Sequence, residues 1–224
     1  MRTIYQKIIL LPILLCSQFA VNAQTAVTEV YPNYKITINK ERLDVDSHRN
    51  RYNGSMLDYS YRKSDGTTIR IKSFQNDAGF EVVETPPEPA IHYVYKRFYA
   101  DGNLKEMGVF LPRQVKVGKW MECDDYGRCT IINHEIERDA YGYNDVLEYL
   151  RMRGHYMPLD DNKWKCSFWH SPDGHTWGTR VDRNDEQYKM YTFDDKGKED
   201  VRENDLFPNK TTYQLDLMYK PGEQ

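Results

Sequence analysis

Two histidines that lie close together in the sequence could bind a metal ion. His170 and His175 bracket the turn sequence Ser171-Pro-Asp-Gly174, in which Asp173 would be a third ligand. Zinc sites usually add a second pair of ligands from elsewhere in the chain, and none stands out in this sequence. Placement in an exposed turn explains both histidines without a metal, so we predict no metal site and no cofactor.

A pair of glutamates could act as acid and base. Glu135 and Glu137 fall on one face of a strand beside His134, and paired carboxylates hydrolyse glycosidic bonds in many enzymes. Polar strands also carry such pairs on their solvated face. The acidic segment Asp194–Asp200 lacks the ligand order of a calcium loop. The sequence contains no nucleophile elbow, phosphate loop or dinucleotide fingerprint. We therefore predict no catalytic residues, with a hydrolase using Glu135, Glu137 or the pair of His170 and His175 as the alternative.

Tryptophans gather in the same part of the chain as the two histidines. Trp164 and Trp169 differ by an odd number of residues, so in a continuous strand they face opposite sides. An exposed tryptophan beside tyrosine and histidine is typical of a protein- or sugar-binding surface, whereas packing in the core is the alternative. The candidate binding residues are Trp169, Trp177, His170 and His175.

The N-terminus predicts export. Residues 1–23 have basic Arg2 and Lys7, an apolar run and a small-residue cleavage motif ending at Ala23, as in a signal peptide. The apolar run is shorter than the roughly 18–20 residues of a membrane span, and no other stretch is long and apolar enough. Lipoprotein anchoring at Cys16 is not expected, because Leu15 is large where that processing prefers a small residue. The Asn-Ala-Gln ending resembles exported proteins of Bacteroidetes-type bacteria. We predict a periplasmic or extracellular protein.

The net charge excludes some classes of partner, and the cysteines predict a disulfide. The chain of 224 residues has a formal charge of −3, and loss of Arg2 and Lys7 with the leader makes it −5, which argues against binding nucleic acid or anionic membranes. Export favours disulfides. Cys123 and Cys129 flank a polar turn, and a hairpin in suitable register would bring them into disulfide range. Cys166 would then be free, and a bridge from Cys166 to either of the others is the alternative.

Turn sequences between aromatic and β-branched runs dominate the rest of the chain. Tips ending in Gly66, Gly102, Gly127, Gly174 and Gly197 supply the positive φ of tight hairpins. The flanking runs predict strands at Tyr59–Arg62, Thr68–Lys72, His92–Tyr99, Lys119–Cys123, Cys129–Ile132 and Lys189–Phe193. Gly102 and Gly127 are 25 residues apart, and Gly174 and Gly197 are 23 apart, which indicates a repeated hairpin.

The order of residues in this repeat carries a family resemblance. Phe98-Tyr-Ala-Asp-Gly-Asn-Leu-Lys-Glu-Met-Gly108, then Gly118-Lys-Trp120 and Asp125-Tyr-Gly127, resembles the variant MORN repeat over about a seventh of the chain. The resemblance implies stacked β-hairpins without catalytic residues of their own, and some relatives are labelled antitoxin-like or immunity proteins. The chain departs from the pattern at Asp124 and in the link Leu111–Val115.

One segment has a helical pattern. Asn144 is suited to cap a helix over about 144–153, Val146, Leu147 and Leu150 share one apolar face, and Gly154 is placed to end it. The helix and the hairpins after it faintly resemble PepSY-type domains. The predicted fold is α+β, mostly β, with consecutive antiparallel MORN-like hairpins. Its regions are the leader 1–23, hairpins over 24–139, the helix with further hairpins over 140–204, and a polar tail over 205–224 with a possible last strand.

These patterns predict a non-catalytic interaction module. The expected partner is a protein of the bacterial envelope or exterior, in the manner of an immunity protein. The alternatives are the envelope glycan hydrolase and a small-ligand binding protein. The sequence leaves the oligomeric state open.

Overall fold

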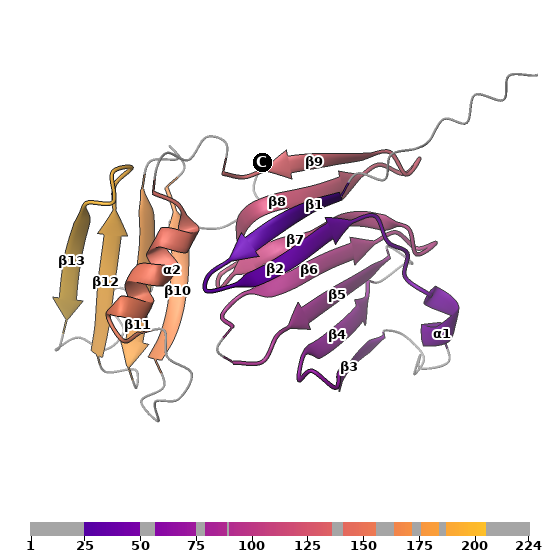
Figure 1. Ribbon diagram of the computed structural model, residues 1–224. Helices are drawn as coiled ribbons and strands as arrows, with labels where there is room; N and C mark the ends of the chain where they lie inside the picture. Colours follow the sequence, from indigo (N-terminus) through magenta and orange to yellow (C-terminus); the bar gives the residue numbers. More distant parts are fainter. Residues whose placement is uncertain are drawn as a thin grey trace, which may run out of the picture.

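A computed structural model confirms the predicted fold class (Figure 1), and it describes residues 25–49, 57–74, 79–88, 90–135, 141–155, 164–171, 176–183 and 187–204. The described elements are β1 (Thr25–Val30), β2 (Tyr34–Asn39), α1 (Val45–Arg49), β3 (Asp58–Arg62), β4 (Thr68–Ser73), β5 (Phe80–Thr85), β6 (Tyr93–Phe98), β7 (Leu104–Leu111), β8 (Val115–Cys123), β9 (Cys129–Asn133), α2 (Tyr143–Met152), β10 (Trp164–His170), β11 (Trp177–Arg183), β12 (Gln187–Phe193) and β13 (Glu199–Asn204). The predicted leader and tail lie outside the described residues.

The largest sheet has seven strands in chain order. Strands β3 to β9 each pair antiparallel with the next, so the sheet is a series of hairpins. The predicted tips are correct at Gly66, Gly102 and Gly127, whose φ angles are +87°, +85° and +75°. Each of these glycines donates its N–H to the carbonyl three residues earlier. Glycine occupies this left-handed region without the steric cost of a Cβ, so the same turn recurs.

A bulge between β7 and β8 leaves space for the Trp120 ring. The pairing of these strands shifts between Met107 and Val109, and Gly108 lies in the shift. A Cβ on Gly108 would come within 2.0 Å of the Trp120 ring. Trp120 is fully buried, and its Nε1–H donates to the Val117 carbonyl at 3.2 Å. Trp120 therefore packs in the interior of the structure.

The hairpin of β1 and β2 crosses one face of the seven-stranded sheet, over β7 and β8 (Figure 1). Ile38 of β2 packs in a buried cluster with residues from the sheet below. Thr28 of β1 is 2% exposed, and its hydroxyl accepts the Lys119 N–H at 2.8 Å and donates to the Lys119 carbonyl at 3.0 Å. This hairpin lies within the predicted hairpin region, but its contacts with β7 and β8 have no local sequence signature.

The third sheet is formed by β10 to β13 in chain order, and α2 lies across one of its faces (Figure 1). The predicted apolar face of α2 is confirmed, since Val146, Leu147 and Leu150 are fully buried. These side chains share one cluster with β11 and β12 of this sheet and with β7 and β8 of the larger one. The two sheets are thus joined by a continuous apolar core, while the predicted regional boundaries stay a prediction.

The start of α2 differs from the prediction. The helix begins at Tyr143, and Gly142 is its N-cap, with the Gly142 N–H bonded to the Asp145 carboxylate at 2.7 Å. The Asn144 amide is instead used for a distant contact, because its Oδ1 accepts the Tyr31 N–H at 2.8 Å and its Nδ2 donates to the Glu29 carbonyl at 3.1 Å. Asn144 therefore fixes the turn between β1 and β2 to the helix rather than capping it.

Among the described residues, neither α1 nor α2 has the length and apolar character needed to cross a membrane.

Candidate functional site: the disulfide tip

The turn between β8 and β9 is closed by a disulfide. Cys123 and Cys129 are paired in the ladder with a Cα–Cα distance of 4.0 Å, and their sulfur atoms are bonded. Residues 123–129 are called the disulfide tip below. Cys166 is the free cysteine of the described residues, and burial raises the pKa of its thiol to about 12. A thiol with so high a pKa stays protonated and unreactive at neutral pH.

Asp124 holds the backbone of the disulfide tip. Its Oδ1 accepts the N–H groups of Tyr126 at 3.0 Å and Arg128 at 2.9 Å, and its Oδ2 accepts Arg128 Nε at 2.7 Å. The Gly127 N–H donates to the Asp124 carbonyl at 2.8 Å. The Arg128 amide, and then the Arg128 guanidinium, hold the pKa of the Asp124 carboxyl below its ordinary value. The carboxylate is therefore ionised at neutral pH and orders the whole turn.

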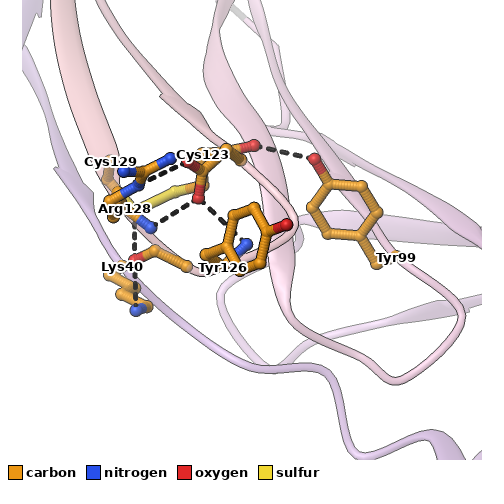
Figure 2. Close-up of polar contacts among 8 residues, drawn as sticks. Lys40, Tyr99, Cys123, Tyr126, Arg128 and Cys129 are labelled. Atoms are coloured by element: carbon orange, nitrogen blue, oxygen red, sulfur yellow. Dashed lines mark hydrogen bonds and ion pairs between the residues drawn. A yellow bond between two sulfur atoms is a disulfide. The ribbon is translucent and has the colours of Figure 1, made fainter.

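Two neighbouring segments support the disulfide tip from outside, as Figure 2 shows. Lys40, which follows β2, donates to the Gly127 carbonyl at 2.7 Å. Tyr99, which follows β6, donates its hydroxyl to the Cys123 carbonyl at 2.9 Å. Burial, and then the nearby Asp125, raise the pKa of Tyr99 to about 12, so the hydroxyl keeps this proton at neutral pH. The tip is thus fixed by a disulfide, a carboxylate and two long-range hydrogen bonds.

The side chains at the end of the tip point to solvent. Tyr126 is 85% exposed, the largest exposed fraction among the large hydrophobic side chains of the described residues. The Arg128 side chain is 79% exposed, and its guanidinium lies 5.4 Å from the centre of the Tyr126 ring. An exposed aromatic ring beside an arginine on a rigid backbone is a surface suited to binding another protein.

The binding residues predicted from the sequence have other roles. Trp177 is 2% and His170 is 7% exposed, and their rings pack edge to face at 4.7 Å. Their predicted place on an exposed binding surface is corrected, because both fill the interior. Trp169 is half-buried over Gly178, where a Cβ would lie 1.8 Å from the indole ring. His175 lies outside the described residues. The alternative prediction, that the tryptophans pack in the core, is confirmed for Trp177.

The acidic side chains considered for catalysis or metal binding mostly accept hydrogen bonds from backbone amides. The Glu135 carboxylate accepts the Gly118 N–H at 3.2 Å, and Glu137 lies outside the described residues. In the acidic segment, Asp194 Oδ1 accepts the amides of Lys196 at 3.0 Å and Lys198 at 2.8 Å. Within the described part of the chain, no three histidine, cysteine or acidic side chains are placed to hold a metal ion.

A surface cavity of about 530 Å³ lies beside α1 and is partly lined by Asp44, Asp46 and Asp101. Asp44 Oδ1 accepts the Ser47 N–H at 3.3 Å. Asp101 accepts the backbone N–H of Asn103 at 2.9 Å and its side-chain amide at 2.6 Å. Asp44 and Asp101 therefore serve their own turns, and the cavity brings no set of groups together for catalysis.

The sequence did not single out Tyr126, Arg128 or Lys40. A signal was present, because two cysteines six residues apart with Asp, Gly and a central Tyr between them describe a closed turn with an aromatic tip. No pattern near Lys40 shows its contact with Gly127, which spans 87 residues.

Comparisons with known proteins give no relative for this chain. No family model matches it, and no curated protein or solved structure is significantly similar to it. The resemblance to variant MORN repeats therefore stays a prediction from the residues, and the candidate site depends on its geometry alone.

Proposed function

We propose that this chain is a non-catalytic, exported interaction module of the bacterial envelope or exterior, which binds a protein partner through the disulfide tip. The observation that carries the proposal is the exposure of Tyr126 and Arg128 on a turn held by a disulfide and by hydrogen bonds from Lys40 and Tyr99. Tyrosine and arginine are enriched among the residues that dominate binding energy at protein interfaces. Because the backbone is already ordered, binding costs less conformational entropy than it would for a flexible loop.

Two further points favour binding over turnover. Among the candidate catalytic groups, Glu135 bonds a backbone amide and His170 is buried. The resemblance to variant MORN repeats also implies a binding protein, and an immunity-like role would fit it. Export through the predicted signal peptide would place the partner in the periplasm or outside the cell.

The test is an affinity capture with a matched control. Mature protein, Gln24–Gln224, is held against envelope and culture-fluid extracts of its own bacterium, and retained proteins are quantified by mass spectrometry. Tyr126→Ala with Arg128→Ala removes the exposed pair. Lys196→Ala with Lys198→Ala replaces the two equivalent positions in the turn between β12 and β13, whose backbone hydrogen bonds are the same.

We expect the wild-type bait to retain one protein in near-equal amount. The tip variant should reduce that amount more than tenfold, as expected when a hot spot worth about 2 kcal/mol or more is removed, and the control should leave it unchanged. Equal retention by both variants would place the interface elsewhere. Retention of glycan alone would favour the hydrolase, to be assayed with Glu135 and Glu137 replaced.

A further inference from the structure

Among the described residues, strand β9 is a sheet edge without the usual protection against pairing. It ends the seven-stranded sheet, and no described strand lies beyond it. Edge strands are commonly protected by charged residues or proline. Among the described strands, the other sheet edges each carry at least one charged residue, whereas β9, Cys-Thr-Ile-Ile-Asn, carries none and has no proline. Its central Thr130, Ile131 and Ile132 are β-branched residues, which favour strand pairing.

The hydrogen bonds of β9 show which backbone groups face outward. The Arg128 carbonyl accepts the Asp124 N–H at 3.0 Å, and the His134 N–H donates to the Gly118 carbonyl at 2.9 Å, so both residues face β8. Residues alternate in an antiparallel pair. The backbone groups of Cys129, Ile131 and Asn133 therefore point away from β8, toward the open edge.

This set of outward groups is symmetric about Ile131. If a second β9 lies antiparallel with Ile131 opposite Ile131, Cys129 of each copy meets Asn133 of the other, and about six backbone hydrogen bonds form. The same register places Thr130 opposite Ile132, which is a favourable cross-strand pair of β-branched side chains.

The charged residues that flank β9 also fit an antiparallel rather than a parallel copy. Arg128 precedes the strand and Glu135 follows it. An antiparallel second copy brings Arg128 of one chain to the end of the ladder that holds Glu135 of the other. A parallel copy would place like charges together, which is unfavourable.

We propose that two copies of this chain associate through β9, with a two-fold axis at Ile131, to give one continuous sheet. This contact is isologous and closed, so it ends at a dimer. It uses the backbone of the edge rather than the Tyr126 ring. It shares Arg128 with the proposed function of the disulfide tip, so it is tested at Asn133, which lies outside the tip.

The first measurement is sedimentation equilibrium of mature protein, Gln24–Gln224, over a concentration series. Asn133→Pro removes the outward N–H of residue 133, which contributes two of the proposed hydrogen bonds by symmetry. Asn133→Ala loses the same side chain but keeps the N–H. We expect a monomer–dimer equilibrium whose dissociation constant rises at least tenfold with Asn133→Pro relative to Asn133→Ala. A monomer at every concentration, or equal dissociation constants for the two variants, would overturn the proposal.

Amide exchange of the wild-type protein tests the same contact without a variant. In a monomer, the Ile131 amide should exchange quickly and the Ile132 amide slowly, because only the second faces β8. In the proposed dimer the Ile131 amide becomes protected as protein concentration rises. If dimers form and Ile131 exchange stays fast, the dimer uses another surface and the proposal is wrong.

Discussion

The disulfide tip and the turn between β12 and β13 have the same backbone and different surroundings. In each, an aspartate starts the turn, and its Oδ1 accepts the amides two and four residues later. Gly127 and Gly197 both have a φ of +75°. Local sequence of the form Asp-Asp-x-Gly followed by a basic residue thus gives one turn twice. Residues 193–199 are called the Phe193 turn below.

The two turns differ in what closes them and in what covers them. The disulfide tip begins at Cys123, which is bonded to Cys129. The Phe193 turn begins at Phe193, which is 1% exposed and packs against Tyr141 with ring centres 5.2 Å apart. A Cβ on Gly197 would lie 2.5 Å from the Tyr141 ring, while one on Gly127 would meet only the Lys40 side chain. A covered turn serves the core, and an open turn held by a covalent bond can present its tip to a partner.

The largest expected effect is on the covered turn. Phe193→Ala removes a ring that packs against Tyr141 and, at 4.9 Å between centres, Tyr149. We expect a loss of about 3–5 kcal/mol in the free energy of unfolding, the usual cost of emptying a buried aromatic site. Urea unfolding measures it, and Lys196→Ala in the same turn should change stability by less than about 0.5 kcal/mol. Equal effects would mean that Phe193 does not anchor this turn.

The seven-stranded and the four-stranded sheets each contain a tryptophan ring packed on a glycine, and the two sites should differ in how well they tolerate an added methyl group. A methyl group on Gly108 would meet the buried Trp120 ring at 2.0 Å, and one on Gly178 would meet the half-buried Trp169 ring at 1.8 Å. Trp169 has solvent on one side and can move outward, whereas Trp120 cannot. We expect Gly108→Ala to cost about 3 kcal/mol and Gly178→Ala about 1 kcal/mol, within the range for overpacking. Denaturant midpoints compare them, and the reverse order would contradict this account.

Replacing the disulfide should affect only the open turn. The chain-entropy relation for so short a loop gives about 2 kcal/mol of stabilisation. Cys123→Ala with Cys129→Ala should lower the free energy of unfolding by that amount, and reduction of the wild-type protein with a thiol should give a similar loss. Amide spectra should change around Tyr126 and stay unchanged around Lys196. Changes of equal size at both turns would show that the disulfide stabilises the sheet as a whole.

Local sequence rules succeeded where the structure depends on neighbours in the chain. The turns at Gly66, Gly102, Gly127 and Gly197 were predicted because positive φ favours glycine wherever it occurs. The apolar face of α2 followed from its spacing in the same way.

The rules failed where a residue serves a distant partner. Asn144 has the chemistry of a helix cap but bonds the turn after β1, more than 110 residues away. Trp177 and His170 are residue types typical of a binding surface, but both are buried, and Trp177 packs in the same apolar cluster as α2. The exposed Tyr126 was missed because exposure depends on which turn the rest of the fold covers. Composition identifies the type of side chain, and only tertiary packing decides whether it meets solvent.

The smallest effect concerns the charge that orders the disulfide tip. Donation from the Arg128 amide first, and then from its guanidinium, holds the pKa of Asp124 below its ordinary value. A lowered carboxyl pKa stabilises the native state above the unfolded pKa, and this contribution is lost as pH falls through the folded value. We expect the Asp124 carboxyl signal, followed by NMR, to titrate below its ordinary range and to shift upward in Arg128→Gln. The Tyr126 and Arg128 amide shifts should follow the same titration, since both donate to this carboxylate. If these amides do not respond when Asp124 is protonated, the disulfide and the supports from Lys40 and Tyr99 are sufficient to order the tip without the carboxylate.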